Sequence, residues 1–246
     1  LNSTRFRRFF ILLFVFIFLL SACQPGTQPT EVSQVSSPTM EEVVATELPT
    51  PEPPSSLMIC IGSEPLTLYP YGGNSRGMWS ILEAIYDGPI DTVDFEYEPV
   101  ILEKIPDYES GDAKIETITV KAGSNIVDAT GNVAVLIPGT RYFPAGCSDE
   151  SCAIEWDGES PVEMEQQTIS YQLKPGILWA DGEPLSTADS IFSYQISIDP
   201  ATPASTYFID RTFSYEAVDD LQTRWVSIPG FITPLLGDLF WHPFPQ

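Results

Sequence analysis

The sequence predicts a mixed protein of the α/β (mixed α+β) class over residues 57–246. Two segments space their apolar residues as an amphipathic helix does, about every third or fourth position. Several segments between residues 95 and 175 instead alternate apolar with polar residues, which is typical of half-buried strands. Prolines, glycines and Asx residues separate these segments at short intervals and mark turns.

The chain of 246 residues begins with a predicted export signal at residues 1–22. Arg5, Arg7 and Arg8 precede an apolar run of 12 residues, and Leu20-Ser21-Ala22-Cys23 follows it. A membrane-spanning helix needs roughly 20 apolar residues, so the run favours a signal over a transmembrane anchor. The Leu-Ser-Ala-Cys motif resembles the lipobox of bacterial lipoproteins. That resemblance implies lipidation of Cys23 and attachment to the outer face of the cell membrane (periplasm or cell surface), with plain secretion as the alternative.

Residues 23–56 comprise this cysteine and a predicted disordered tether. Positions 24–56 hold seven prolines, ten Ser/Thr and five Glu, with no Lys, Arg or aromatic residue. Such a segment cannot bury enough apolar surface to offset its chain entropy. We expect it to hold the globular part clear of the membrane.

The charge of the chain limits its partners. The sequence has 34 Asp/Glu against 11 Lys/Arg, which gives a formal net charge of −23. A chain so acidic repels phosphate groups, which argues against nucleic acid and anionic membrane surfaces as partners. We expect contact with the membrane through the lipid anchor alone.

Residues 57–90 predict a strand, a loop and a helix. The apolar residues 57–62 suit a short buried strand, in which Cys60 would be a buried thiol. Prolines and glycines make residues 64–74 a loop. Ser75 is placed to cap a helix that Gly88-Pro89 would stop. Its apolar positions predict core packing: Met78, Ile81, Leu82, Ile85 and Tyr86.

The middle of the chain predicts strands. Ile118 and Val120 alternate with polar residues, as does the segment 133–137, and the pair suggests a hairpin closed by the turn at 128–132. That turn lacks the spaced ligands of a calcium loop, so a plain turn is expected. Alternation at Ile169, Tyr171 and Leu173 predicts another strand.

The last third predicts a helix between turns. Asp181-Gly182 forms a tight turn, and Ser186 with Asp189 approaches a capping box for a helix that Asp199-Pro200 ends. Residues 215–226 predict two strands joined at Asp219-Asp220, and residues 232–240 predict a final helix.

The sequence carries little that suggests catalysis. It contains no nucleophile elbow, Walker loop or zinc pattern, and its single histidine, His242, is expected to be a packed or surface residue. We therefore expect no enzymatic activity, no metal and no cofactor. Cys147 and Cys152 enclose four residues, which in an exported protein favours a local disulfide. A metal site would need further Cys or His ligands close in sequence, and none is there.

One stretch resembles a known family. Tyr171-Gln172-Leu173-Lys174-Pro175-Gly176, Trp179-Ala180-Asp181-Gly182-Glu183-Pro184-Leu185 and the Ser186 cap resemble the signature of the family 5 extracellular solute-binding proteins. These are the oligopeptide and dipeptide receptors of ABC importers. Flanking pieces agree in order: Leu68-Tyr69-Pro70, Tyr86-Asp87-Gly88, Asp199-Pro200-Ala201-Thr202 and Glu216-Ala217-Val218-Asp219-Asp220. Ala180 replaces the usual Ser, and Ser190 replaces an apolar residue.

The resemblance implies a periplasmic-binding-protein-like type II fold, in which two lobes flank a cleft. Residues 57–90 would be the N-terminal segment of the large lobe and residues 91–246 the small β-rich domain. The chain would then end before the second lobe, so that the fold is incomplete. The implied ligand contacts are Tyr69, Tyr71 and Asn74 in the cleft loop and Tyr207 against the ligand backbone.

The function implied is that of a solute-binding receptor, which we expect to be a monomer. It would capture an extended solute, a peptide above all, and deliver it to the permease subunits of an ABC importer. Another class stays open: a surface structural or adhesive lipoprotein on the same scaffold, without transport. A secreted hydrolase is the third and weakest interpretation.

Overall fold

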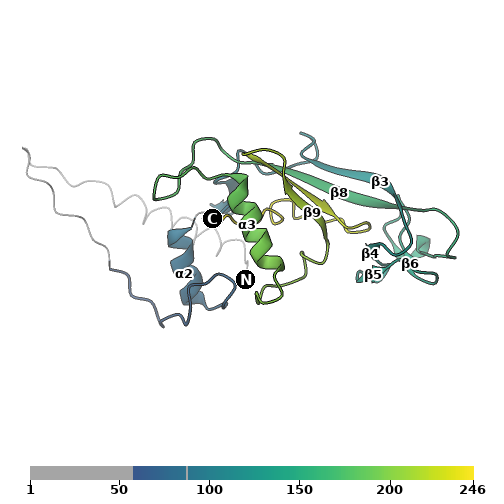
Figure 1. Cartoon of the computed structure of the whole chain (residues 1–246), viewed down its shortest axis with the longest axis horizontal. Helices are drawn as coiled ribbons and strands as arrows, with labels where there is room; N and C mark the ends of the chain where they lie inside the picture. The colour runs from purple at the N-terminus through teal and green to yellow at the C-terminus, as the bar shows by residue number, and fades with distance from the viewer. Residues whose placement is uncertain (1–57, 87) are drawn as a thin grey trace, which may run out of the picture. The chain divides into compact units, whose positions relative to one another are not determined.

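The computed structural model describes residues 58–86 and 88–246, and Figure 1 shows their course. Residues Met58–Gln246 cluster as one compact unit. The leader, Cys23 and the tether lie outside the described residues, so the predictions for them remain predictions. The division into domains at residue 90 also stays a prediction.

The chain is a mixed α and β protein with antiparallel sheets. Its helices are α2 (Arg76–Ile85), α3 (Thr187–Ile198) and the 3-10 turn η1 (Glu150–Cys152). Its strands are β1 (Ile90–Val93), β2 (Glu96–Pro99), β3 (Ala113–Val120), β4 (Asn125–Val127), β5 (Val133–Val135), β6 (Arg141–Tyr142), β7 (Ile154–Glu155), β8 (Val162–Gln172), β9 (Thr212–Ala217) and β10 (Gln222–Ser227). Among the described residues, no helix has both the length and the apolar character that crossing a membrane requires.

Among the described residues, the main sheet has four strands in the order β3-β8-β10-β9, and three two-stranded pairs accompany it: β1-β2, β4-β5 and β6-β7. The long strand β8 supplies side chains to two cores on opposite faces, because successive residues of a strand alternate between faces. Val162 and Met164 pack in a core with Tyr142 and Trp156. Ile169 and Tyr171 occupy the other face.

The larger core lies against the second half of β8. Trp225 of β10 pairs in register with Ile169 of β8 and with Tyr215 of β9, and all three are buried. The chain end contributes Leu239 and Phe240 to the same core. These two residues end a helix predicted for 232–240 that the structure replaces with turns, as Figure 1 also shows.

That predicted final helix is wrong for a physical reason. Pro234 disfavours the helical conformation at the residue before it, Thr233, and Gly237 is a weak helix former. Short turns replace it: Leu236 N donates to Pro234 O at 3.0 Å and Asp238 N to Leu235 O at 3.2 Å. The apolar residues of this segment indicate burial, which turns can also provide.

Helix α3 begins and ends where the sequence predicts. Ser186 Oγ accepts from Ala188 N at 3.2 Å, and the Asp189 carboxylate accepts from Ser186 N at 2.9 Å, which completes the capping box. The helix contacts β9, and its buried residues include four small polar ones: Thr187, Ser190, Ser193 and Ser197. Ser190 Oγ and Tyr215 Oη lie 2.7 Å apart across this contact.

Two predictions for the first half of the chain are wrong. Residues 58–62 form no strand, and Met58 is 91% exposed, so Cys60 is an exposed thiol rather than a buried one. The segment 133–135 pairs with Asn125–Val127, while Ile118 and Val120 pair with Met164 and Val162. The turn at 128–132 is correct. Alternation identifies a strand but does not identify its partner.

Candidate functional site

A cavity of about 680 Å³ opens where helix α2, strand β1, the loop before α2 and the chain end meet. Helix α2 and its cap contribute Trp79, Leu82, Glu83 and Tyr86. The loop contributes Pro70 and Tyr71, the start of β1 with the two residues before it contributes residues 88–91, and the chain end contributes His242 and Phe244. A cavity of this size is within the range of small-ligand pockets, roughly 300–1,000 Å³.

The helical wall follows from the spacing of its residues. Ser75 caps α2 by accepting from Met78 N at 3.2 Å, and Met78 and Leu82 anchor the helix because both are buried. Trp79, Glu83 and Tyr86 then share one face, since residues three and four apart on a helix are neighbours. Trp79 stays 44% exposed, which leaves its ring accessible from the cavity mouth.

The loop wall is a tight turn. Gly72 N donates to Tyr69 O at 2.8 Å, and Tyr69 N donates to Thr67 Oγ1 at 3.0 Å. A β-carbon at Gly72 would lie 3.0 Å from Thr67 Cγ2 and 3.2 Å from Tyr69 O, so the turn favours glycine there. Burial, together with the nearby Tyr69, raises the pKa of Tyr71 to about 12. The Tyr71 hydroxyl therefore stays protonated at physiological pH.

The third wall is the chain end, which helix α3 holds in place. Phe244 N donates to the backbone oxygen of Asp189 at 3.3 Å. The Phe244 ring meets the rings of Tyr71 and Tyr86, each with centroids 6.0 Å apart, and Tyr86 meets His242 at 5.9 Å. These contacts are edge-to-face, which is a favourable arrangement for aromatic pairs. The rings form a continuous lining around part of the cavity.

The structure separates the residues predicted to contact ligand. Tyr71 lines the cavity. Tyr69 is not a lining residue, but its ring contacts the ring of Tyr71, with centroids 5.8 Å apart. Asn74 is exposed in the loop just before α2 and is not among the lining residues. Tyr207 lies elsewhere, beneath the guanidinium of Arg211 at 4.0 Å.

Tyr207 belongs to a separate cluster. Its ring meets Phe208 and Phe231 edge-on, and Arg211 donates to the backbone oxygens of Tyr207 and Gly131. This arrangement ties the 207–211 segment to the turn between β4 and β5. The side chain is 52% exposed, so its surface remains accessible.

The lining residues that sequence reasoning missed come from two sources. Trp79 and Glu83 lie on the helix that the sequence predicts, and their i, i+4 spacing beside the cleft loop was the available signal. Tyr86 was assigned to the core, although it is half-buried and lines the cavity. His242 and Phe244 are more than 150 residues distant from α2 in sequence, so no local pattern places them there.

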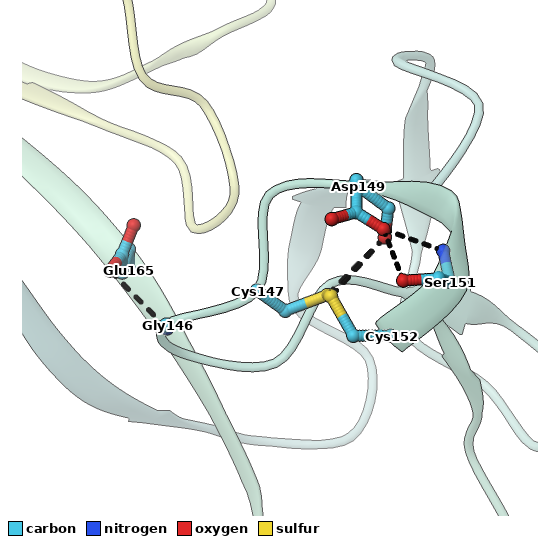
Figure 2. The surroundings of a disulfide bond; sticks show 6 residues. All are labelled: Gly146, Cys147, Asp149, Ser151, Cys152 and Glu165. Carbon is cyan, nitrogen blue, oxygen red and sulfur yellow. Dashed lines mark hydrogen bonds between the residues drawn. A yellow bond between two sulfur atoms is a disulfide. The ribbon is translucent and has the colours of Figure 1, made fainter.

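Cys147 and Cys152 form a disulfide, with an S–S distance of 2.06 Å, in the connection between β6 and β7 (Figure 2). Asp149 Oδ1 accepts from Ser151 N at 2.8 Å within the loop, and Gly146 N donates to Glu165 Oε1 of β8 at 3.3 Å. Both sulfur atoms lie within 3.5 Å of the Asp149 backbone oxygen. The loop is thus fixed internally and attached to the main sheet.

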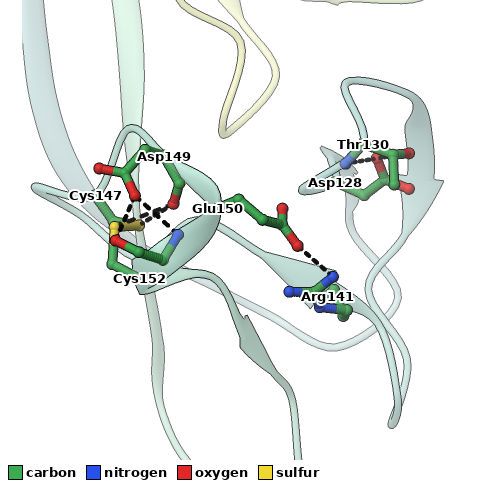
Figure 3. A network of polar contacts seen from close by, with 8 residues as sticks. Asp128, Thr130, Arg141, Cys147, Asp149, Glu150 and Cys152 are labelled. Atoms are coloured by element: carbon green, nitrogen blue, oxygen red, sulfur yellow. Dashed lines mark hydrogen bonds and ion pairs between the residues drawn. A yellow bond between two sulfur atoms is a disulfide. The ribbon is translucent and has the colours of Figure 1, made fainter.

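Polar contacts continue beside the disulfide, as Figure 3 shows. Arg141 of β6 pairs with Glu150 of η1 at 2.6 Å. Asp128 Oδ1 accepts from Thr130 N at 2.8 Å and from Asn132 N at 3.0 Å. Burial acts to raise the pKa of Asp128, but the hydrogen bond from Thr130 Oγ1 at 2.7 Å and these backbone donors outweigh it and hold the pKa below its ordinary value. Such contacts are those of a closed turn.

Metal binding has no support in the part of the chain that the structure describes. No three His, Cys, Asp or Glu side chains gather there in a way that could hold an ion. The acidic turn at 128–132 is satisfied by its own hydrogen bonds.

Comparison with known proteins finds one weak likeness. No family model and no curated protein matches the chain. Among solved structures, it is similar to the oligopeptide-binding protein of Thermus thermophilus complexed with a pentapeptide, with a TM-score of 0.46 and 14% sequence identity. The match covers 70% of this chain and 22% of that one, so this chain spans well under half of its length. A likeness of this extent decides neither fold nor ligand.

Proposed function

We propose that the chain is a solute-binding receptor, which captures an extended solute, most simply a peptide, in the cavity beside α2. In this proposal it belongs to an ABC importer, carries part of a type II binding-protein fold, is anchored outside the cell membrane through Cys23 and passes its cargo to a permease. It binds without chemical conversion.

The observation that carries the proposal is the composition of the cavity. Aromatic and apolar side chains form most of its wall, and a few polar groups converge on it, which is typical of small-ligand sites. The loop that supplies Tyr71 is also the loop in which the family resemblance puts ligand contacts. Loop backbone and ring faces suit an extended peptide, which is bound largely through main-chain hydrogen bonds.

The signature region supports the same site. Its capping box starts α3, and the backbone of Asp189 in that box holds Phe244 in the cavity wall. Trp179 Nε1 also donates to the Asp189 carboxylate, at 3.3 Å. The residues that resemble the family signature therefore position one wall of the cavity.

The test is ligand-dependent thermal stability of the full chain in detergent, measured with peptides of two to eight residues. A ligand that binds only the folded state stabilises it by about 2.7 kcal/mol at 100 times its Kd, so the melting temperature should rise with peptide concentration. Trp79→Ala should reduce that rise, while Tyr97→Ala, an exposed aromatic outside the cavity, should not. A flat response across all peptides would count against the proposal.

A surface or adhesive role has one observation in its favour. The β1-β2 hairpin presents Phe95 and Tyr97, which are 101% and 75% exposed. Exposed aromatic residues of this kind are enriched where proteins contact other macromolecules. A melting temperature that does not change with peptides, combined with loss of adhesion in Phe95→Ala, would favour this second role.

A further inference from the structure

The cavity beside α2 combines aromatic rings with negative charge. Its rings come from Tyr71, Trp79, Tyr86, His242 and Phe244. The face of an aromatic ring carries a negative electrostatic potential, which attracts a cation within about 6 Å of the ring centre. Rings contributed by three different segments can surround one group from several sides.

Two carboxylates complete the lining. Glu83 follows Trp79 by one helical turn, and Asp91 is the second residue of β1. Among the described residues that line the cavity, none is Lys or Arg. A cationic group would therefore meet the two opposite charges of Glu83 and Asp91.

Among the described residues, no Lys or Arg pairs with these carboxylates. Within residues 58–86 and 88–246, Lys and Arg form the ion pairs Lys104–Asp112, Arg141–Glu150 and Arg224–Glu216, and none of these includes Glu83 or Asp91. Asp91 Oδ1 accepts from Thr92 N at 2.7 Å, and an ionised carboxylate has further acceptor sites. Both side chains belong to exposed residues, so an incoming ligand can reach them.

Helix α2 carries one Lys or Arg residue, Arg76. It lies in the first turn of α2, seven residues before Glu83, which places it about 10 Å away along the helix axis. Arg76 is not among the lining residues. Arg76 therefore adds no positive charge to the wall of the cavity.

We propose that the cavity recognises an organic cation, the ammonium or guanidinium group of a basic side chain in a peptide ligand. This inference rests on the proposed function, because it specifies the cargo of the same site. The rings supply the apolar contact and the cation–π attraction, and Glu83 and Asp91 select the charge. The acidic surface of the whole chain adds a long-range attraction for the same ligands.

The experiment compares three tripeptides by calorimetric titration of the full chain in detergent at low salt. All three peptides have acetylated N-termini, so that no α-ammonium is present. Ala-Lys-Ala carries the side-chain ammonium, Ala-norleucine-Ala keeps the four side-chain carbons without it, and Ala-Glu-Ala carries a carboxylate instead. We expect the lysine peptide to bind about tenfold more tightly than the norleucine peptide, which corresponds to the usual strength of a cation over aromatic rings. Choline, tested alone, distinguishes a peptide side chain from a free quaternary amine.

Charge variants test which residues select the cation. Glu83→Gln with Asp91→Asn should lower the affinity for the lysine peptide toward that for the norleucine peptide and leave the part of the preference that the aromatic rings supply. Glu163→Gln removes one charge at an exposed position of β8 outside the cavity and should leave the ratio unchanged. Unfolding of each variant with temperature confirms that the fold is retained.

The outcomes separate the two proposals. Equal binding of the lysine and norleucine peptides would overturn the cation selectivity while leaving peptide binding in place. Binding of choline but of no peptide would also overturn the inference as stated. Absence of binding for all three peptides and for choline would remove the proposed function together with it.

Discussion

The side-chain amide of Gln167 pairs with the main chain of Thr233 through two hydrogen bonds. Thr233 N donates to Gln167 Oε1, and Gln167 Nε2 donates to Thr233 O, both at 2.9 Å. Gln167 Nε2 also donates to Tyr108 Oη at 2.7 Å, and the residue is fully buried. One buried side chain thus fixes the segment after β10 to the middle of β8.

This pairing predicts a large effect of Gln167→Leu. The variant would leave the buried N–H and C=O of Thr233 without partners, so the free energy of unfolding should fall by about 2–4 kcal/mol. Urea unfolding measures it. Gln172→Leu is the matched control on the same strand, because no side-chain hydrogen bond of Gln172 occurs among the described residues, and it should change stability by much less. Equal losses in both variants would contradict the role given to the Gln167 amide.

The hairpin tip predicts a stabilising substitution. Asp94 and Phe95 form the two-residue loop between β1 and β2, with φ angles of 52° and 70°. A hairpin turn with two positive φ angles favours glycine at its second position, and the left-handed region costs other residues roughly 1–2 kcal/mol. Phe95→Gly should therefore raise the free energy of unfolding by about 1 kcal/mol, since the exposed ring makes little contact.

The control for the hairpin lies two residues along. Tyr97 is also exposed, but it belongs to β2, where glycine weakens a strand by roughly 0.5–1 kcal/mol. Tyr97→Gly should accordingly lower stability in the same urea titration. If both glycine variants shifted stability in the same direction, backbone strain at Phe95 would not be the cause.

Local signals in the sequence were enough for several elements. The Ser186–Asp189 box fixed the start of α3 because its hydrogen bonds span only three residues, and the Asp219-Asp220 turn fixed the β9-β10 pair for the same reason. The partner of each strand was harder to predict, because the alternation at Ile118 and Val120 is compatible with pairing either to the segment 133–137 or to β8. β3 pairs with β8, which lies more than 40 residues later in the chain. The alternation within β3 does not indicate how far away its partner strand is.

The cavity shows the same limit. Tyr71 and the helix carrying Glu83 were predictable from the loop and the cap, but the wall at His242 and Phe244 depends on contacts made across the whole fold. Gln167 reaches Thr233 over 66 residues, and no periodicity marks either residue. A binding site assembled from distant segments can therefore be predicted only in part from one sequence.

The disulfide predicts a modest contribution to stability. It closes a loop with a sequence separation of five residues, for which chain entropy gives about 2 kcal/mol. The double variant Cys147→Ala, Cys152→Ala should lose that amount or less, because Ser151 and Glu150 hold the loop through other contacts. Urea unfolding of the parent chain with reductant should reproduce the loss. No change on reduction, with the variant clearly weakened, would point to packing rather than to the covalent bond.

Asp157 predicts a change in the response to acid. Hydrogen bonds from Ser160 Oγ at 2.6 Å, Ser160 N at 2.7 Å and Glu159 N at 2.8 Å lower the pKa of Asp157 from 3.8 to about 2. The unfolded chain binds this proton at the higher pKa. The stabilising effect is therefore complete above about pH 4 and is lost as the pH falls from about 4 to about 2.

Ser160→Ala tests this dependence directly. Loss of the hydroxyl donor should raise the pKa of Asp157 toward its ordinary value, as measured by the carbon-13 shift of its carboxyl group against pH. The acid-induced fall of the urea midpoint between about pH 4 and pH 2 should become shallower by the same change. Ser80→Ala, at an exposed serine of α2, should leave both curves unaltered. An unchanged Asp157 titration in Ser160→Ala would show that the Ser160 hydroxyl does not hold the proton affinity of this carboxylate down, and the backbone N–H donors would then account for the lowered pKa.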